Sequence, residues 1–262
     1  WGQPARVRAR VEEGNKVVVN ATNVARYQLN LPAALAEPSK PLQVWTNGAR
    51  EVFSAWKPGR PVVVELEKGE AGLQKTATLC GPVREVFLSP FLLVPGTKGD
   101  EASRAKLHAW AERWAAEWSA FADGVPAIRP DHALTEADLN THNLVLFGDR
   151  HTNQVLARMA DALPVELTTE GYRLNERKVQ GTALGLLMVY PNPLAPQRLV
   201  CVYSGEFWGD GLDVNHKFDL VPDFIVFRNE LDGDDPARTP RAVCAGYFDS
   251  RWRVSRDLTW EP

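Results

Sequence analysis

The sequence lacks the features that mark several large classes of protein. Its apolar runs stay far below the roughly 20 residues that cross a bilayer, so we expect no membrane association. The first residues, Trp1-Gly2-Gln3-Pro4, do not have the basic-then-apolar order of a signal peptide. The formal net charge is only -3, and no basic stretch is interleaved with aromatic residues. We therefore expect no nucleic-acid partner.

Cysteine is scarce, which limits both redox and metal chemistry. Cys80, Cys201 and Cys244 lie far apart and form no C-x-x-C spacing. We interpret them as buried apolar thiols. A Cys201–Cys244 disulfide is the alternative, because pairing cannot be deduced from spacing alone.

No metal site or cofactor is expected. The five histidines show neither H-x-x-x-H nor H-x-H spacing. Residues 209–219, GDGLDVNHKFD, carry alternating acidic residues as a calcium loop does. They lack the glutamate at position 12 of that loop, so we interpret the segment as a solvated loop.

The composition is that of a globular protein. The chain has 262 residues, of which 44% are hydrophobic and 24% charged, and this length allows one large domain or two small ones. We find no internal repeat and no low-complexity tract. Because the chain does not begin with Met, we expect a mature form or a piece of a longer protein.

The fold class that we expect is mixed α/β. Residues 1–80 contain short alternating strands without intervening helices, which is typical of a small antiparallel β-sandwich. Asn47-Gly48 predicts a type I′ hairpin turn within it. Residues 81–262 contain strand-like runs of mainly apolar residues at 144–147, 184–190, 198–203 and 224–227. Together with helical segments, these runs predict an α/β domain around a central, mostly parallel sheet.

The spacing of apolar residues predicts a helix over residues 101–123. Trp110, Trp114 and Trp118 recur every four residues on its apolar face. This stripe fits packing on a sheet better than sugar binding, because each ring then buries a large apolar area. A second, short helix is expected after Thr135, with Asp138 completing an imperfect capping box.

The first candidate site follows the apolar run 144–147. Asp149, His151, Thr152 and Asn153 come between that strand and the next helix. Ligands of open α/β sheets bind at the carboxyl ends of strands, and a helix N-terminus offers free N–H groups to an anion. The alternative is purely local, with Asp149 closing a turn and Thr152 or Asn153 capping the helix.

A second candidate set lies at the ends of the next two strands. Tyr190 and Asn192 follow one apolar run, and Ser204, Gly205 and Glu206 follow the other. If both strands run parallel to residues 144–147, these side chains share an edge with Asp149 and form a polar cleft. The alternative is that all five are ordinary turn residues.

A nucleophilic set is the third candidate. Ser204, His216 and Asp223 occur in the order hydroxyl, base and orienting acid within a short stretch. Catalysis by such a set requires the serine within hydrogen-bond reach of the histidine, and the histidine within reach of the acid. These types also recur together by chance in ordinary sequences.

Three segments, with the tryptophan-rich helix between the first two, together resemble a known family. They are GPVREVFLSPFLLVPGT (81–97), LTEADLNTHNLVLFGDRHTNQVLARMADALPV (134–165) and MVYPNPLAPQRLVCVYSG (188–205). In this order they are similar to the region that follows the hydrolase domain in large bacterial prolyl-oligopeptidase-like proteins. Those proteins are serine hydrolases or esterases of the α/β-hydrolase type. Their catalytic serine lies in a G-x-S-x-G elbow, and this sequence contains no such pentapeptide.

The resemblance implies a non-catalytic accessory or assembly region of a prolyl-oligopeptidase-like or esterase-like hydrolase. Such a region would pack on a catalytic α/β-hydrolase domain or on a partner chain, would include homo-oligomers among its assemblies, and would be secreted or periplasmic. The alternative is a self-standing hydrolase or small-ligand-binding protein. Its site would then lie at the strand ends marked by Asp149, Tyr190 and Ser204.

Overall fold

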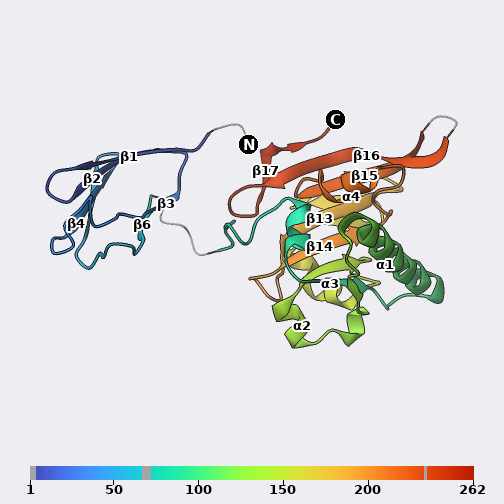
Figure 1. Ribbon diagram of the computed structural model, residues 1–262. Coiled ribbons are helices and arrows are strands. Elements are labelled where there is room, and N and C mark those ends of the chain that lie inside the picture. The colour runs from blue at the N-terminus through green and yellow to red at the C-terminus, as the bar shows by residue number, and fades with distance from the viewer. Residues whose placement is uncertain (1–3, 67–71, 233–234) are drawn as a thin grey trace. The chain divides into compact units, whose positions relative to one another are not determined.

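The computed structural model describes residues 4–66, 72–232 and 235–262. The chain divides into two compact units, Trp1–Gly72 and Leu73–Pro262, referred to as unit 1 and unit 2. Unit 1 is drawn in blue shades in Figure 1, and unit 2 runs from teal to red. Each unit has a separate core of buried apolar side chains.

Unit 1 consists of two small sheets. The four-stranded sheet has the order β1-β2-β4-β5, and β3 pairs with β6 in the other. Pairing is antiparallel except between β2 and β4, which run parallel. The purely antiparallel arrangement expected from the sequence is therefore wrong, because the chain leaves the first sheet to form β3 before it returns as β4. The strands are β1 (Arg6–Glu12), β2 (Lys16–Thr22), β3 (Arg26–Leu29), β4 (Leu42–Thr46), β5 (Ala49–Phe53) and β6 (Val62–Glu65).

The predicted hairpin between β4 and β5 is confirmed. Asn47 and Gly48 have φ angles of 48° and 90°, the two positive values that a type I′ turn requires. The Asn47 side chain also accepts from the Ala21 N–H at 2.9 Å and donates to the Ala21 carbonyl at 2.8 Å. The turn residue thus joins the hairpin to β2.

Unit 2 is built on an eight-stranded mixed sheet of order β17-β16-β15-β13-β14-β9-β7-β8 (Figure 1). Strands β8, β7, β9 and β14 pair in parallel, and every pairing from β14 through β13 to β17 is antiparallel. The sheet is therefore not mostly parallel. Its strands are β7 (Phe91–Pro95), β8 (Ala127–Ile128), β9 (Asn143–Phe147), β13 (Gly185–Pro191), β14 (Leu199–Ser204), β15 (Phe224–Asp232), β16 (Asp235–Phe248) and β17 (Val254–Trp260).

The runs of mainly apolar residues form the centre of this sheet. Every residue of β9, β13 and β14 is buried, as the runs predicted. Strands covered on both faces need apolar residues at every position, which explains why these three show no alternation. The meander β10 (Val165–Thr168), β11 (Gly171–Leu174) and β12 (Arg177–Gln180) forms a separate three-stranded antiparallel sheet.

Helix α1 (Glu101–Ala122) confirms the tryptophan-rich helix. Asp100 caps its first turn, and Trp114 is buried among Phe87, Trp118 and Phe218. Among the helices in the described ranges, none has the length and hydropathy needed to cross a membrane. The other helical segments are η1 (Val83–Leu88), η2 (Asp131–Ala133), α2 (Glu136–Thr141), α3 (Gln154–Met159), η3 (Ala160–Ala162) and α4 (Val214–Phe218).

All three cysteines are free. Cys201 in β14 and Cys244 in β16 are fully buried, as expected for apolar thiols, and the Cys201–Cys244 disulfide is not formed. Burial raises the pKa of Cys244 to about 12. A thiol with such a pKa is almost entirely protonated at neutral pH and is a poor nucleophile.

The capping box of α2 is also confirmed. Asp138 accepts from the Thr135 N–H at 2.9 Å and from the Thr135 hydroxyl at 2.7 Å, and Thr135 Oγ1 accepts from the Asp138 N–H. Arg129 pairs with the other carboxylate oxygen. The hydrogen bonds from Thr135, supported by Arg129, lower the pKa of Asp138 to about 2.

This carboxylate makes the stability of unit 2 depend on pH. The pKa of Asp138 lies below the unfolded value of about 3.9, so its contribution is complete above roughly pH 4 and is lost as the pH falls. We expect Asp138→Asn to lower the free energy of unfolding by about 2 kcal/mol at pH 7 and by about half as much at pH 3. Urea titrations at both pH values measure this difference. Glu136→Gln, an exposed change in the same turn, should show a pH-independent effect below about 0.5 kcal/mol.

Candidate functional site

The loop after β9 is fixed by its backbone and by one buried asparagine. Gly148 has a φ of 119°, and a Cβ at this position would lie 2.7 Å from Thr152 Oγ1. Asn153 is fully buried and caps α3 by accepting from the N–H groups of Val155 and Leu156. Its amide also donates to the carbonyls of Val94 and Phe147. Asn153 is thus the cap that the sequence left open, and all of its polar atoms are used within the fold.

The two carboxylate oxygens of Asp149 differ in their contacts: one accepts hydrogen bonds from the loop, and the other does not. Its Oδ1 accepts from the His151 N–H, the Thr152 N–H and the Thr152 hydroxyl, at 2.8, 2.9 and 2.9 Å. Within the described residues, no group donates to its Oδ2. The imidazole of His151 is exposed and likewise has no hydrogen-bond partner there. Thr152 therefore positions Asp149, while Asp149 and His151 keep polar atoms for a ligand.

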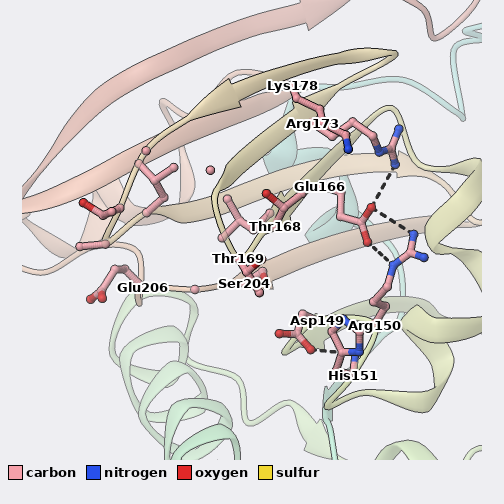
Figure 2. A pocket seen from close by; sticks show the side chains of 17 residues that line it. Asp149, Arg150, His151, Glu166, Thr168, Thr169, Arg173, Lys178, Ser204 and Glu206 are labelled. Carbon is pink, nitrogen blue, oxygen red and sulfur yellow. Dashed lines mark hydrogen bonds and ion pairs between the residues drawn. The ribbon is translucent and has the colours of Figure 1, made fainter.

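A cleft of about 720 Å³ opens where β9 and β14 end (Figure 2). Ser204, the last residue of β14, is 4% exposed, and its hydroxyl makes no hydrogen bond within the described residues. The meander β10–β12 forms the facing wall. The polar side chains that line the cleft are Asp149, Arg150, His151, Glu166, Thr168, Thr169, Arg173, Lys178, Thr182, Ser204 and Glu206.

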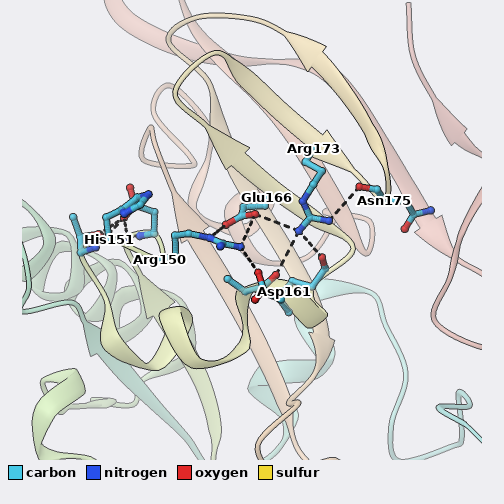
Figure 3. A network of polar contacts seen from close by, with 10 residues as sticks. Arg150, His151, Asp161, Glu166, Arg173 and Asn175 are labelled. Carbon is cyan, nitrogen blue, oxygen red and sulfur yellow. Dashed lines mark hydrogen bonds and ion pairs between the residues drawn. The ribbon is translucent and has the colours of Figure 1, made fainter.

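Two arginines hold a glutamate in this wall (Figure 3). Glu166 forms a two-pronged ion pair with Arg150, in which Nη2 lies 3.0 Å from Oε2, and Arg173 donates to the same Oε2 at 3.2 Å. Arg150 also pairs with Asp161 at 2.9 Å. Hydrogen bonds to Glu166 raise the pKa of Arg150 above its already high value. Both guanidiniums are thereby fixed as charged groups beside the cleft.

Two other charged side chains that line the cleft, Lys178 and Glu206, are not used in ion pairs among the described residues. Figure 2 shows Lys178 and Arg173 on one side and Asp149 and Ser204 on the other. The cleft can therefore offer the Lys178 ammonium to one part of a ligand, and a carboxylate and a hydroxyl to another part.

Tyr190 and Asn192 do not belong to this cleft. Because β13 runs antiparallel to β14, Leu186 lies opposite Ser204 and Pro191 opposite Leu199. The end of β13 therefore lies at the other edge of the sheet, and the shared edge expected from parallel strands is wrong. Asn192 is buried in the turn, and burial raises the pKa of Tyr190, whose ring packs on Phe248 and Trp252.

The structure does not assemble the set Ser204, His216 and Asp223. No hydrogen bond among the described residues joins any two of them. Asp223 is fully buried and ion-paired with Lys75 at 2.6 Å, and His216 is exposed on α4. The histidine that lines the cleft with Ser204 is His151 instead. In the part of the chain that the structure describes, no cluster of His, Cys, Asp and Glu side chains is arranged to hold a metal.

The sequence did not identify the residues of the meander β10–β12 as part of the cleft, although one feature of the sequence indicated that Glu166 and Arg173 lie together. A hairpin turning at Thr169-Glu170 places Glu166 opposite Arg173, and this is the observed register. Opposite charges at such a cross-strand pair attract each other and mark a shared face. The contribution of Arg150 could not be deduced, because it depends on how the meander packs against the loop after β9.

The comparisons with known proteins give no relative. A scan against protein-family models finds no match for this chain, and searches of curated proteins and of solved structures find none either.

Proposed function

We propose that the chain is a non-catalytic binding module that accompanies a prolyl-oligopeptidase-like or esterase-like hydrolase, with unit 2 holding a small polar ligand in the cleft. The observation that carries the proposal is the set of unused polar atoms at the ends of β9 and β14. Ser204 Oγ and Asp149 Oδ2 lack hydrogen bonds within the described residues and line one cleft. Buried or half-buried polar groups are normally paired, so unpaired ones facing a cleft suit a ligand.

The charges around the cleft define the class of ligand. Lys178 suits an anionic group, and Asp149 with Ser204 suits a hydrogen-bond donor such as an ammonium or a hydroxyl. The proposed ligand is therefore a small organic acid that carries an amine or a hydroxyl, such as an amino acid or a hydroxy acid.

Calorimetric titration of the purified chain with amino acids, dipeptides and hydroxy acids tests this proposal. We expect Asp149→Asn to weaken binding of amine-bearing acids at least tenfold, because a charge-assisted hydrogen bond is lost. The asparagine retains a carbonyl oxygen for the N–H groups of His151 and Thr152, so the loop should persist. Lys178→Met should weaken every acid in the panel by a similar factor.

Two surface variants serve as matched controls. Asp257→Asn and Lys98→Met change exposed residues that make no side-chain hydrogen bond or ion pair within the described ranges, and they should leave binding unchanged. No binding by any acid in the panel would refute the ligand proposal. Equal losses in the cleft variants and in the controls would show that the effect comes from overall charge.

A hydrolase acting in the same cleft is the second candidate. The observation that favours it is that Ser204, His151 and Asp149 all line one cleft, so a hydroxyl, an imidazole and a carboxylate face the same cavity. Hydrolysis of p-nitrophenyl esters and proline p-nitroanilide peptides tests it. Turnover that both Ser204→Ala and His151→Ala abolish, and that the exposed change Ser89→Ala spares, would establish an enzyme and refute the non-catalytic module.

The hydrolase partner is proposed from the ordered motifs in residues 81–97, 134–165 and 188–205, and from their resemblance to the region after a hydrolase domain. Its test is reconstitution with a prolyl-oligopeptidase-like catalytic domain. A stable complex with altered ester or peptide turnover supports the proposal. Turnover that is identical with and without the chain, and no complex in gel filtration, contradicts it.

A further inference from the structure

Strand β1 leaves one edge of the unit 1 sheet open. It pairs with β2 on one side and is the first strand in the sheet order. Within the described residues no strand pairs with its other side, and six of its seven residues are exposed. An open edge of this length presents a row of backbone N–H and C=O groups that can pair with another extended chain.

One face of this strand carries a row of positive charge. Arg6, Arg8 and Arg10 alternate along β1 and lie opposite Thr22, Asn20 and Val18 of β2. Their side chains share one face, at intervals of about 6.8 Å along the strand. Arg10 pairs with Glu12 at 2.7 Å, and within the described residues Arg6 and Arg8 have no acidic partner. The chain as a whole has a net charge of -3, so this row is a local feature.

The other face of β1 is apolar and incompletely covered. Val7, Ala9 and Val11 lie opposite Ala21, Val19 and Val17 of β2. Val17 and Val19 are 1% and 0% exposed in the core of unit 1, whereas Val7 and Val11 are 43% and 37% exposed. The apolar layer of the core therefore continues onto β1, where the described residues leave it partly exposed.

We propose that β1 binds an extended segment of another protein in which acidic and apolar residues alternate, so that the segment becomes a fifth strand of the sheet. Backbone hydrogen bonds along the open edge would give affinity. Acidic side chains beside Arg6, Arg8 and Arg10, and apolar side chains beside Val7 and Val11, would give the register and the sequence preference.

Two different roles for these arginines predict different binding behaviour. Charged residues on an edge strand also prevent aggregation, and arginines that act only in this way would not select an acidic peptide over a neutral one. A polyanion such as single-stranded nucleic acid would use the same charges without backbone pairing or an apolar partner. Of these three modes, only strand addition requires acidic side chains, free backbone N–H groups and the alternation of acidic with apolar residues at the same time.

Fluorescence anisotropy with the complete chain tests the proposal, using a labelled nine-residue peptide in which Glu alternates with Val. We expect this peptide to bind about tenfold more tightly than the matched Gln–Val peptide, since each opposite-charge pair on a sheet adds a modest gain and Arg6 and Arg8 each form a new one. N-methylation of every second backbone nitrogen, placed on the pairing edge, should abolish binding. A peptide with the same residues in blocks of Glu and Val should bind as weakly as the Gln–Val peptide.

Protein variants provide the second arm. Arg8→Glu reverses the central charge of the row on an exposed position, and we expect it to weaken Glu–Val binding about tenfold. Arg60→Glu, an exposed change in the loop before β6, makes the same change in net charge and should have less than a twofold effect. Equal binding of the Glu–Val and Gln–Val peptides would overturn the proposal. So would undiminished binding after N-methylation, or stronger binding of a polythymidine oligonucleotide that displaces the peptide.

Discussion

Replacing Trp114 with alanine is expected to lower the free energy of unfolding of unit 2 by about 3–5 kcal/mol. The side chain is 1% exposed and stacks on Trp118 with ring centroids 5.4 Å apart. The centroid of its ring also lies 5.2 Å from that of Phe87 and 5.1 Å from that of Phe218. Alanine would leave a large cavity where α1 packs on the sheet, and the surrounding rings can collapse only partly into that space.

A second variant separates the contribution of the Trp114 indole hydrogen bond from that of the volume that its ring fills. Trp114 Nε1 donates to the Tyr203 hydroxyl at 3.0 Å in a fully buried position. Trp114→Phe keeps most of the ring but removes this donor, so we expect a smaller loss of about 1–3 kcal/mol. Trp260 is 53% exposed, and Trp260→Ala should cost under about 0.5 kcal/mol.

Native-state hydrogen exchange is the appropriate measurement, because it reads the two units separately. In Trp114→Ala the amides of β9 and β14 should lose protection, and those of β2 and β4 in unit 1 should keep theirs. A stability loss below about 1 kcal/mol would show that α1 does not contribute to the core as described.

Removing the Lys75 ammonium is expected to cause the second large loss in the free energy of unfolding. This ammonium lies 2.6 Å from Asp223 Oδ2 and 2.8 Å from the Phe248 carbonyl, and 5.0 Å above the ring of Trp252. Asp223 is 0% exposed, and its Oδ1 has no partner among the described residues. Lys75→Met would leave a buried carboxylate without its counter-charge, at a cost of about 3–5 kcal/mol in the free energy of unfolding.

A double-mutant cycle distinguishes the ion pair from simple packing. Lys75→Met combined with Asp223→Leu removes both charges, and we expect it to recover at least half of the loss caused by Lys75→Met alone. Lys98→Met, at an exposed lysine of the same unit, should change stability by less than about 0.5 kcal/mol. If the double variant is no more stable than the single one, the pair is not the source of the effect.

The position of Gly81 explains why this pair tolerates little change nearby. A Cβ on Gly81 would lie 1.7 Å from Asp223 Oδ1. No side chain fits there unless the carboxylate moves, and such a move would break the contacts of Asp223 with Lys75 and the Phe248 N–H.

Several elements could be predicted from the sequence because local chemistry decides them. Runs of apolar side chains without alternation predicted the buried strands β9, β13 and β14, and the four-residue spacing of tryptophans predicted α1. The capping box of α2 followed from Thr135 and Asp138. In each case the residues that specify the element lie within or next to it.

The direction of β13 relative to β14 could also have been inferred from the length of the segment that connects them, although no motif marks it. Only residues 192–198 connect β13 to β14. A parallel connection needs a crossover of about a dozen residues or more, so this short link demands an antiparallel pair. That inference separates Tyr190 and Asn192 from Ser204. It leaves Asp149, His151, Ser204, Gly205 and Glu206 as the sequence-predicted residues that line the cleft.

The rest of the cleft depends on contacts between distant segments. Lys178 lies on β12, a strand that the sequence did not predict because Arg177–Gln180 has neither an apolar run nor strict alternation. The contact of Arg150 with Glu166 depends on how the meander packs against the loop after β9. Tertiary packing of this kind leaves no periodic signal in the sequence.

The order of strands in unit 2 has a consequence for how quickly the protein folds. In the sheet, β9 pairs with β7 and with β14, and each partner lies some fifty residues away along the chain. Loops of that length must close before β9 gains either of these partners, whereas β1 with β2 and β4 with β5 are joined by tight turns. We therefore expect unit 1 to collapse first in refolding. The late formation of the β7-β9-β14 centre would expose its apolar strands for longer, and refolding yield should fall with protein concentration for that reason.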